Sequence, residues 1–354
     1  MQMVKKSASS WIGYAGLGLG IILIVYLFSK VDLQRSVELI SSIGVSSVFI
    51  LLPYLALHLI ETVAWIRLFP GTITVIPFLT LLKIQFIAET VSMTFPAGVA
   101  VGESLRPILC RRFLDIPVPA GVASVAVRKL MLGVAQGLYT IIGVIAGFSV
   151  MQAASVPMLG FEGLPFIMLG AGSAVFLLFL FFLLLLLNGK AAQKLHGLLM
   201  LVPFQRVKTW LLAKESGFLD TDKELKSFRA PFAGRLFLLI FIYLFAWFML
   251  AIESYIILKL LGLEITFAQV LAIDTSLTML RALFFFIPSG LGVQEIGYLA
   301  FFQAIGMNDV QAYGGAFVLL RRFKEVLWYA FGYGIMFFSG VHLRDADRVS
   351  NGEL

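Results

Sequence analysis

Two glutamates, Glu103 and Glu295, end nearly identical motifs in an otherwise apolar chain. The motifs are Pro96–Glu103 (PAGVAVGE) and Pro288–Glu295 (PSGLGVQE), which begin 192 residues apart. A carboxylate in a hydrophobic helix costs about 3 kcal/mol to insert into lipid, so such a residue faces a cavity or a cationic partner. The recurrence of the whole motif favours a duplicated unit. The alternative is two unrelated breaks in hydrophobic helices.

Proline and glycine in each motif predict a turn within an apolar segment. The predicted turn residues are Pro96, Gly98, Gly102, Pro288, Gly290 and Gly292. Broken backbone at membrane depth is tolerated only where protein or water satisfies its N–H and C=O groups. Helix N-termini exposed at such breaks attract anions. Two turns that meet would therefore form a polar pocket.

Charged side chains also lie in or beside the apolar segments. The basic residues are Arg106, Arg111, Arg112, Arg128, Lys129, Arg281, Arg321, Arg322 and Lys324. They outnumber the acids, which are Glu89, Glu103, Glu253, Asp274, Glu295 and Glu325. This surplus favours an anionic ligand, and a phosphate suits arginine best. The alternative is that the charges form internal ion pairs.

The spacing of polar residues also suggests two further pairs of side chains. Glu89 and Arg281 each lie seven residues before a motif proline, and their opposite signs predict a pair between the two units. His58 and Glu61 lie one helical turn apart, as a proton relay or as a hydrogen-bonded packing pair.

The composition identifies the protein class. The chain has 354 residues, 60% of them hydrophobic and 13% charged, and its mean hydropathy is +0.97. These values exclude a soluble protein and indicate a polytopic membrane protein. The net charge of +7 comes from Lys and Arg residues gathered between apolar spans. This distribution indicates which loops lie in the cytoplasm and does not indicate a nucleic-acid partner. The single Cys and three scattered His predict no disulfide, metal site or cofactor.

Hydropathy predicts an all-α bundle with six full crossings in a single integral membrane domain, 1–354. The predicted crossings are 11–29, 45–69, 118–148, 163–187, 236–261 and 310–338. Segment 188–235 is rich in Lys and Arg, which predicts a cytoplasmic amphipathic insert, and connection 150–162 has neither, which predicts an external loop. The N-terminus and the tail 339–354 are expected in the cytoplasm.

The charge rule then constrains the remaining segments. For both ends of the bundle to lie inside, 76–112 must enter and leave from the cytoplasm and 267–306 from outside. These segments are predicted to be re-entrant helical hairpins in two repeats, 11–148 and 163–338. Three crossings per repeat place the repeats in opposite orientation, which is the inverted repeat of many transporters. Ordinary paired spans would satisfy the same end points.

These motifs resemble a known family. The string Gly102-Glu103-x-x-Arg106, the basic Val127-Arg128-Lys129 and the second motif with Gly306 behind it are similar to the transmembrane domain of lysylphosphatidylglycerol synthase, also called flippase-like membrane proteins. The spacing between Pro96 and Gly102 resembles the hopanoid-associated branch. The chain departs from the family pattern at Ser289 and at Val127, where an acid is usual.

The resemblance implies lipid handling without the aminoacyl-transfer domain of the two-domain members. We expect a translocator for an anionic, phosphate-bearing or hopanoid-type lipid in the cytoplasmic (inner) membrane of a bacterium. Arg106, Arg128, Arg281 and Arg321 would bind the headgroup, and Glu103 and Glu295, with Glu89 nearby, would position these cations or change protonation. No catalytic residue is predicted, and the lipid and the oligomeric state stay open.

Two other functions fit the same sequence. A membrane-embedded lipid-modifying transferase would use Glu103 as its base, although no nucleophile–base constellation is evident. A non-transporting scaffold would recruit lipid-synthesis enzymes through segment 188–235.

Overall fold

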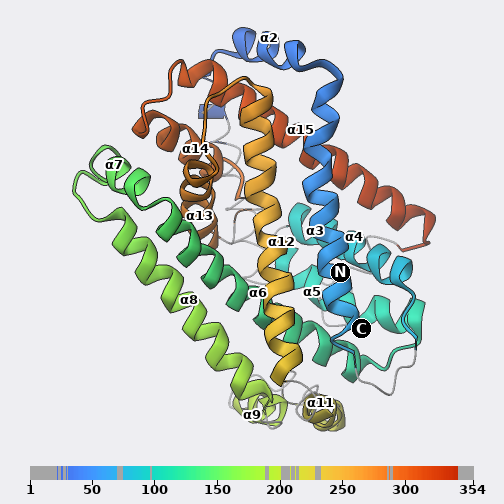
Figure 1. The fold of residues 1–354 in the computed structure, drawn as a ribbon. Coiled ribbons are helices and arrows are strands. Elements are labelled where there is room, and N and C mark those ends of the chain that lie inside the picture. Colours follow the sequence, from blue (N-terminus) through green and yellow to red (C-terminus); the bar gives the residue numbers. More distant parts are fainter. Residues whose placement is uncertain are drawn as a thin grey trace, which may run out of the picture.

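The structure is a computed structural model that describes residues 31–69, 75–95, 98–187, 191–200, 215–227, 233–284, 287 and 290–341, with residues 22, 25, 26, 29, 208 and 212. Every regular element in these residues is a helix (Figure 1). In chain order they are α2 (Leu33–Ile43), the 3-10 helix η1 (Gly44–Leu51), α3 (Leu52–Ile66), α4 (Phe78–Thr94), α5 (Gly98–Leu114), α6 (Val118–Ala146), α7 (Phe148–Leu159), α8 (Leu164–Leu187), α9 (Ala191–Leu199), α11 (Glu215–Ser227), α12 (Ala233–Leu260), α13 (Phe267–Leu283), α14 (Val293–Ala304) and α15 (Val310–Phe338).

Among the described residues, four stretches are long and apolar enough to cross a membrane, as expected for a polytopic helical membrane protein. They are Leu33–Ile66, Val118–Ala146, Leu164–Leu187 and Gly234–Leu260. Helix α15 has 29 residues, about 43 Å of helix, but it carries four charges between Arg321 and Glu325. The first predicted crossing, 11–29, lies almost entirely outside the described residues, so the number of six crossings stays a prediction.

The two predicted hairpins are pairs of antiparallel helices. In the first, α4 and α5 correspond to the predicted segment 76–112, and Gly102 of α5 faces Ala88 and Ser92 of α4. In the second, α13 and α14 lie within 267–306, and Gly297 of α14 faces Leu277 of α13. The pairs lie on opposite sides of α12 (Figure 1). Their re-entrant character and their inverted relation stay predictions.

The six predicted turn residues differ in where the structure places them. Pro96 and Pro288 lie outside the described residues. Gly290 and Gly292 have positive φ values of 61° and 82°, a conformation that glycine adopts without steric cost. Gly98 begins α5. The second turn therefore depends on glycine as the motif predicted.

Segment 150–162 is mostly helix, so the prediction of a plain loop was wrong. Helix α7 covers Phe148–Leu159 and buries Met151 and Ala154 completely. Absence of Lys and Arg reports the side of the membrane and does not exclude a helix. The Ser155 hydroxyl also accepts a hydrogen bond from the Leu164 backbone N–H at 3.1 Å, which connects α7 to the start of α8.

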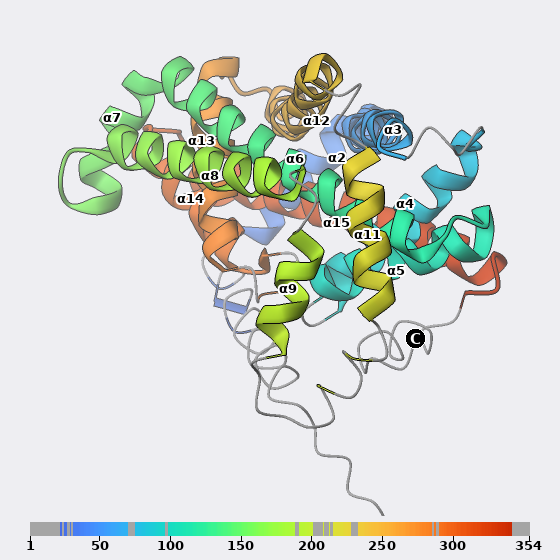
Figure 2. The same ribbon diagram turned by 90° about the horizontal axis from the view of Figure 1, so that it is seen from below.

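In its described residues, the predicted insert forms helices α9 and α11, which lie at one end of the bundle in Figure 1 and face the viewer in Figure 2. The Asp222 carboxylate of α11 accepts hydrogen bonds from the backbone N–H groups of Ala192 and Gln193, both at 2.9 Å. An acid at a helix N-terminus satisfies otherwise unpaired N–H groups. These contacts join α11 to the N-terminus of α9. The tail from 342 onward lies outside the described residues.

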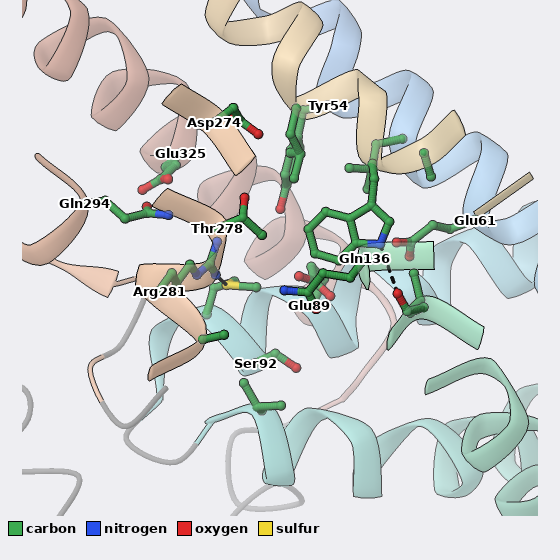
Figure 3. A pocket seen from close by; sticks show the side chains of 18 of the residues that line it. Tyr54, Glu61, Glu89, Ser92, Gln136, Asp274, Thr278, Arg281, Gln294 and Glu325 are labelled. Atoms are coloured by element: carbon green, nitrogen blue, oxygen red, sulfur yellow. Dashed lines mark hydrogen bonds between the residues drawn. The ribbon is translucent and has the colours of Figure 1, made fainter. Parts of the chain in front are cut away.

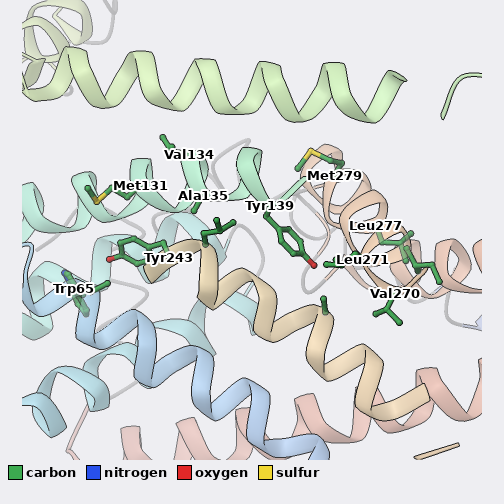
Figure 4. Close-up of a cluster of buried hydrophobic side chains, with 14 of the residues drawn as sticks. Trp65, Met131, Val134, Ala135, Tyr139, Tyr243, Val270, Leu271, Leu277 and Met279 are labelled. Carbon is green, nitrogen blue, oxygen red and sulfur yellow. The ribbon is translucent and has the colours of Figure 1, made fainter. Parts of the chain in front are cut away.

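Close helix packing forms the core around α6. Gly137 of α6 lies so near α8 that an added Cβ would be 2.5 Å from the Phe176 backbone nitrogen. Small residues allow helix backbones to approach in membranes, where apolar burial against lipid supplies no net driving force. On the other side, Tyr139 and Tyr243 lie between α6 and α12 (Figure 4). The α6 helix is thus held between two neighbours and can position charged side chains.

Replacing Gly102 by alanine is expected to destabilise the first hairpin by about 1 to 3 kcal/mol. An added Cβ would overlap the Ser92 hydroxyl and lie 2.5 Å from the Ala88 carbonyl oxygen, which is backbone and cannot turn away. Thermal unfolding in detergent, followed by tryptophan fluorescence, measures the loss. Gly170→Ala on α8 is the control because nothing lies within 4 Å of that position. An unchanged unfolding temperature for Gly102→Ala would contradict the packing.

Candidate functional site

A cavity of about 450 Å³ lies at the centre of the bundle, where both hairpins meet α3, α6, α12 and α15 (Figure 3). Five of the predicted site residues line it: Glu89, Glu103, Arg128, Arg281 and Arg321. Arg106 and Glu295 are buried behind its wall. The structure thus brings charges from both halves of the sequence into one cavity.

The first motif acid, Glu103, is the centre of a group of cations. Its carboxylate lies 2.8 Å from Arg106, 3.2 Å from Lys129 and 3.7 Å from Arg128. The side chain keeps 20% of its surface exposed, toward the cavity. Three cations on one carboxylate keep it ionised and hold the three side chains in place. The position of Glu103 therefore fits the expected role of positioning cations.

Arg106 is fixed by polar groups of α4. Its side chain is 1% exposed, lies 3.2 Å from Glu89 and donates to the Gln85 amide oxygen at 3.4 Å. The predicted pair between Glu89 and Arg281 is not among the contacts of the described residues, because Glu89 pairs with Arg106 within the first hairpin. Arg281 instead lies 3.0 Å from the Met93 sulfur, one helical turn from Glu89 on α4. A single Met–Arg contact thus connects the ends of α4 and α13.

Arg128 takes its partner from α3. Its guanidinium donates to Glu61 at 2.6 Å, and the same Glu61 oxygen accepts from Gln85 at 2.6 Å. Val127, which replaces the acid usual in the resembling family, leaves Arg128 with acids from α3 and α5 instead. His58 contacts the rings of Tyr54 and Phe86, so Glu61 and His58 form neither a relay nor a hydrogen-bonded pair among the described contacts.

The second half holds Arg321 through hydroxyl groups. Arg321 donates to Tyr298 at 2.6 Å and to Ser254 at 3.1 Å. Both hydroxyls reach Asp274, at 3.3 and 3.4 Å, and Tyr139 donates to the other Asp274 oxygen at 2.7 Å. Arg321 is therefore compensated by Asp274 through two intervening hydroxyl groups.

The two motif acids have matching partners. Glu103 pairs with Lys129 of α6, and Glu295 pairs with Arg322 of α15, which follows Lys129 by 193 residues. Arg322 also pairs with Glu325, so two acids share one cation. The same offset relates the Glu61–Arg128 contact to the Ser254–Arg321 contact. Equivalent contacts at offsets of 192 and 193 residues support the interpretation of a duplicated unit.

A further ion pair closes the cavity near Tyr54. The Lys324 amine lies 2.9 Å from both oxygens of Glu253, with side-chain exposures of 4% and 1%. The same amine lies 4.4 Å from the Tyr54 ring centroid, within cation–π range. Neither residue was a predicted site residue, although both are charges inside apolar spans.

The charges around the cavity are balanced, which corrects the expected surplus of cations. The lining cations are Arg128, Lys129, Arg281, Arg321 and Lys324. The lining acids are Glu61, Glu89, Glu103, Asp274 and Glu325, which are equal in number. The sequence count included Arg111 and Arg112, which lie at the far end of α5. The sequence count of acids also omitted Glu61, because the sequence analysis had paired this residue with His58.

Sequence reasoning missed Gln85 and Tyr298, and it paired Glu61 with His58 and not with Arg128. One signal could have found Glu61: it stands 193 residues before Ser254, as Arg128 stands before Arg321. Gln85 and Tyr298 are neutral, and uncharged side chains do not stand out in a hydropathy profile. Their roles follow only from the atoms they contact.

The described residues contain no group of three or more His, Cys, Asp or Glu side chains placed to hold a metal ion. The arrangement can bind a small charged or dipolar group, because its wall combines cations, acids and aromatic rings. Direct contact with a headgroup stays a prediction for Arg128, Arg281 and Arg321. Arg106, behind the wall, is placed to orient Glu89 and Glu103.

Comparison with known proteins supplies the family. No curated protein and no solved structure shows a significant match to the chain. The family model of the lysylphosphatidylglycerol synthase TM region matches residues 13–331, which include both hairpins and the whole cavity. The narrower resemblance to a hopanoid-associated branch stays a prediction. This integral membrane protein therefore belongs to the family of the lysylphosphatidylglycerol synthase transmembrane region.

Proposed function

We propose that the protein translocates a phosphate-bearing lipid, whose headgroup enters the central cavity while its acyl chains stay in the bilayer. The observation that carries this proposal is the state of Arg281. Among the described residues, it is the lining cation that contacts neither a carboxylate nor a hydroxyl, since its recorded partner is the Met93 sulfur. A weak sulfur acceptor is readily replaced by a phosphate oxygen, which forms a charge-assisted hydrogen bond.

The position of the cavity rim supports entry from the side. Phe95 and Val99 flank the first predicted turn, and Ala282 and Ile287 precede the second; all four line the cavity. Val99 is 41% exposed and Ala282 is also exposed. The wall thus reaches the surface between the tips of the two hairpins. A headgroup entering there would meet Arg281 first, since Arg281 lies one residue before Ala282.

Alternating access would follow from movement of one hairpin against the other. The Arg281–Met93 contact joins the two hairpin tips and would break or form as the cavity changes its opening. The chain carries no nucleotide-binding motif, so a gradient or simple equilibration would provide the driving force. We place the protein in the inner membrane of a bacterium with both termini in the cytoplasm, as the charge distribution favours.

A transferase is the less favoured alternative. Glu103, its expected base, is held by three cations, and a carboxylate so stabilised is a poor proton acceptor. A scaffold acting through segment 188–235 would not need a charged cavity. Both alternatives predict that lipid movement is unaffected by changes in the cavity wall.

Arg281→Gln is expected to slow lipid translocation about tenfold, because it removes one charge-assisted contact to the phosphate. The measurement uses liposomes with purified protein and a phospholipid labelled on an acyl chain, whose outer-leaflet label is destroyed by a membrane-impermeant reductant. Arg35→Gln is the matched control, since Arg35 is exposed on α2 and its ion pair among the described residues is with Glu38, one helical turn away. Wild-type rates in the Arg281 variant would remove the proposed headgroup contact, and no movement with the wild-type protein would remove translocation itself.

A further inference from the structure

We infer that the lipid carried by this cavity has a zwitterionic headgroup, with a phosphate and an ammonium group whose charges sum to zero. This inference rests on the proposed translocation and names its substrate class. It departs from the anionic lipid that the charged residues of the sequence favour. The net charge of the buried cluster, the sharing of cations among its acids and the arrangement of its wall each contribute one step.

The first step is the net charge of the buried cluster. We define the charge cluster as the ten charged lining residues together with the charged residues that ion pairs connect to them, directly or, for Glu295, through Arg322. Its cations are Arg106, Arg128, Lys129, Arg281, Arg321, Arg322 and Lys324. Its acids are Glu61, Glu89, Glu103, Glu253, Asp274, Glu295 and Glu325. The two sets are equal, so the cluster is neutral when all its members are ionised.

Neutrality decides between lipid classes. An anionic headgroup would leave a net negative charge in the cavity once water is displaced, and an uncompensated charge at membrane depth is costly. A zwitterionic headgroup would leave the sum unchanged. A cavity that must admit and release its lipid repeatedly favours the ligand that adds no net charge.

The second step locates the two poles. In the first half of the cluster, three cations serve three acids, and each acid has at least one cation of that half within 4 Å. In the second half, Arg322 serves both Glu295 and Glu325, whereas Arg281 contacts no acid among the described residues. The second half thus holds two acids that share one cation, and one cation, Arg281, whose recorded partner is a sulfur atom. A headgroup with both charges would satisfy both.

Glu325 is the acid that faces the ligand. Glu325 lines the cavity, whereas Glu295 is buried behind the wall. The contact of Glu325 with Arg322 uses the Oε2 atom. Figure 3 shows Glu325, Gln294, Thr278 and Arg281 on one side of the cavity. The phosphate would bind Arg281, and the ammonium group would bind Glu325.

The aromatic residues of the same wall suit an ammonium group. Tyr329 follows Glu325 by one helical turn and lines the cavity, as do Tyr54 and Trp247. Aromatic faces attract ammonium groups, and the Lys324 amine already occupies such a position at the Tyr54 ring. An anionic glycerol headgroup would gain nothing from these rings.

The test compares two lipids that differ only in the headgroup. Phosphatidylethanolamine and phosphatidylglycerol, with identical labelled acyl chains, are placed in uncharged liposomes containing the wild-type protein. We expect phosphatidylethanolamine to cross at least about tenfold faster. Equal rates, or faster movement of phosphatidylglycerol, would overturn the zwitterionic class and leave translocation standing. If neither lipid moves, the proposed function fails as well.

Variants assign the ammonium contact. Glu325→Gln is expected to bring the ratio of the two rates close to one by slowing phosphatidylethanolamine, since glutamine keeps the shape of the side chain without its charge. Glu162→Gln, on the exposed connection between α7 and α8, is the control and should keep the wild-type ratio. A wild-type ratio in Glu325→Gln would exclude Glu325 as the ammonium partner. The wild-type comparison stands even if this variant folds poorly.

Discussion

Glu103→Gln is expected to abolish lipid translocation and to lower the free energy of unfolding by about 3 kcal/mol. The carboxylate binds Arg106, Lys129 and Arg128. Glutamine would leave these three cations with two acids, Glu89 and Glu61, so one positive charge at the cavity wall would lack a countercharge. Removal of one partner from a buried ion pair is strongly destabilising because a charge stays behind uncompensated. Translocation in liposomes and thermal unfolding in detergent measure the two effects.

The matched control is the acid of the second motif. Glu295→Gln leaves Arg322 with Glu325 as a partner, so we expect a smaller loss of stability than for Glu103→Gln. The contrast tests the environments of two residues that occupy the same motif position. Equal losses in the two variants would show that the three-cation group around Glu103 has no special role. Normal translocation in a Glu103→Gln, Glu295→Gln double variant would remove both acids from the functional site.

Glu253→Gln is expected to destabilise the protein by about 3 to 5 kcal/mol, because it leaves the Lys324 ammonium buried without a countercharge. The pair joins the C-terminal half of α12 to the middle of α15, and both side chains are almost fully buried. A second change should restore most of the loss: Glu253→Leu combined with Lys324→Met replaces the pair by apolar groups. Chemical or thermal unfolding of the single and double variants measures the recovery.

The double variant also separates stability from charge balance. It removes one cation and one acid, so the charge cluster stays neutral and the preference for a zwitterionic lipid should persist. Lys259→Gln on the same helix is the control, since its contact with Glu264 is 3.9 Å long and exposed, and such pairs contribute little. If the free energy of unfolding were the same for Glu253→Gln and Lys259→Gln, the Glu253–Lys324 pair would not stabilise the packing of α12 against α15.

Much of the fold could be predicted because it depends on local pattern. Runs of apolar residues about the thickness of a bilayer predicted the crossings that became α6, α8 and α12 with little change in their bounds. The doubled motif predicted the two helix pairs, since each motif places proline and glycine close together. A lone proline such as Pro107 inside α5 does not end its helix. The misassigned segment 150–162 shows the limit: charge composition reports the side of the membrane, and α7 arises from burial of Met151 and Ala154.

The sequence alone determined the membrane class, the helical architecture, the family and the set of charges that must lie within the bundle, because each depends on composition or on short-range spacing. Only the tertiary structure decided how those charges pair. Glu61 lies 67 residues from Arg128, and Glu253 lies 71 residues from Lys324. Whether such residues meet depends on how each helix is rotated about its axis, which close packing such as that at Gly137 determines. Arg111 and Arg112 lie in the last turn of α5, away from the cavity, whereas Glu61 of α3 lines it. These positions convert an expected excess of cations into a neutral site.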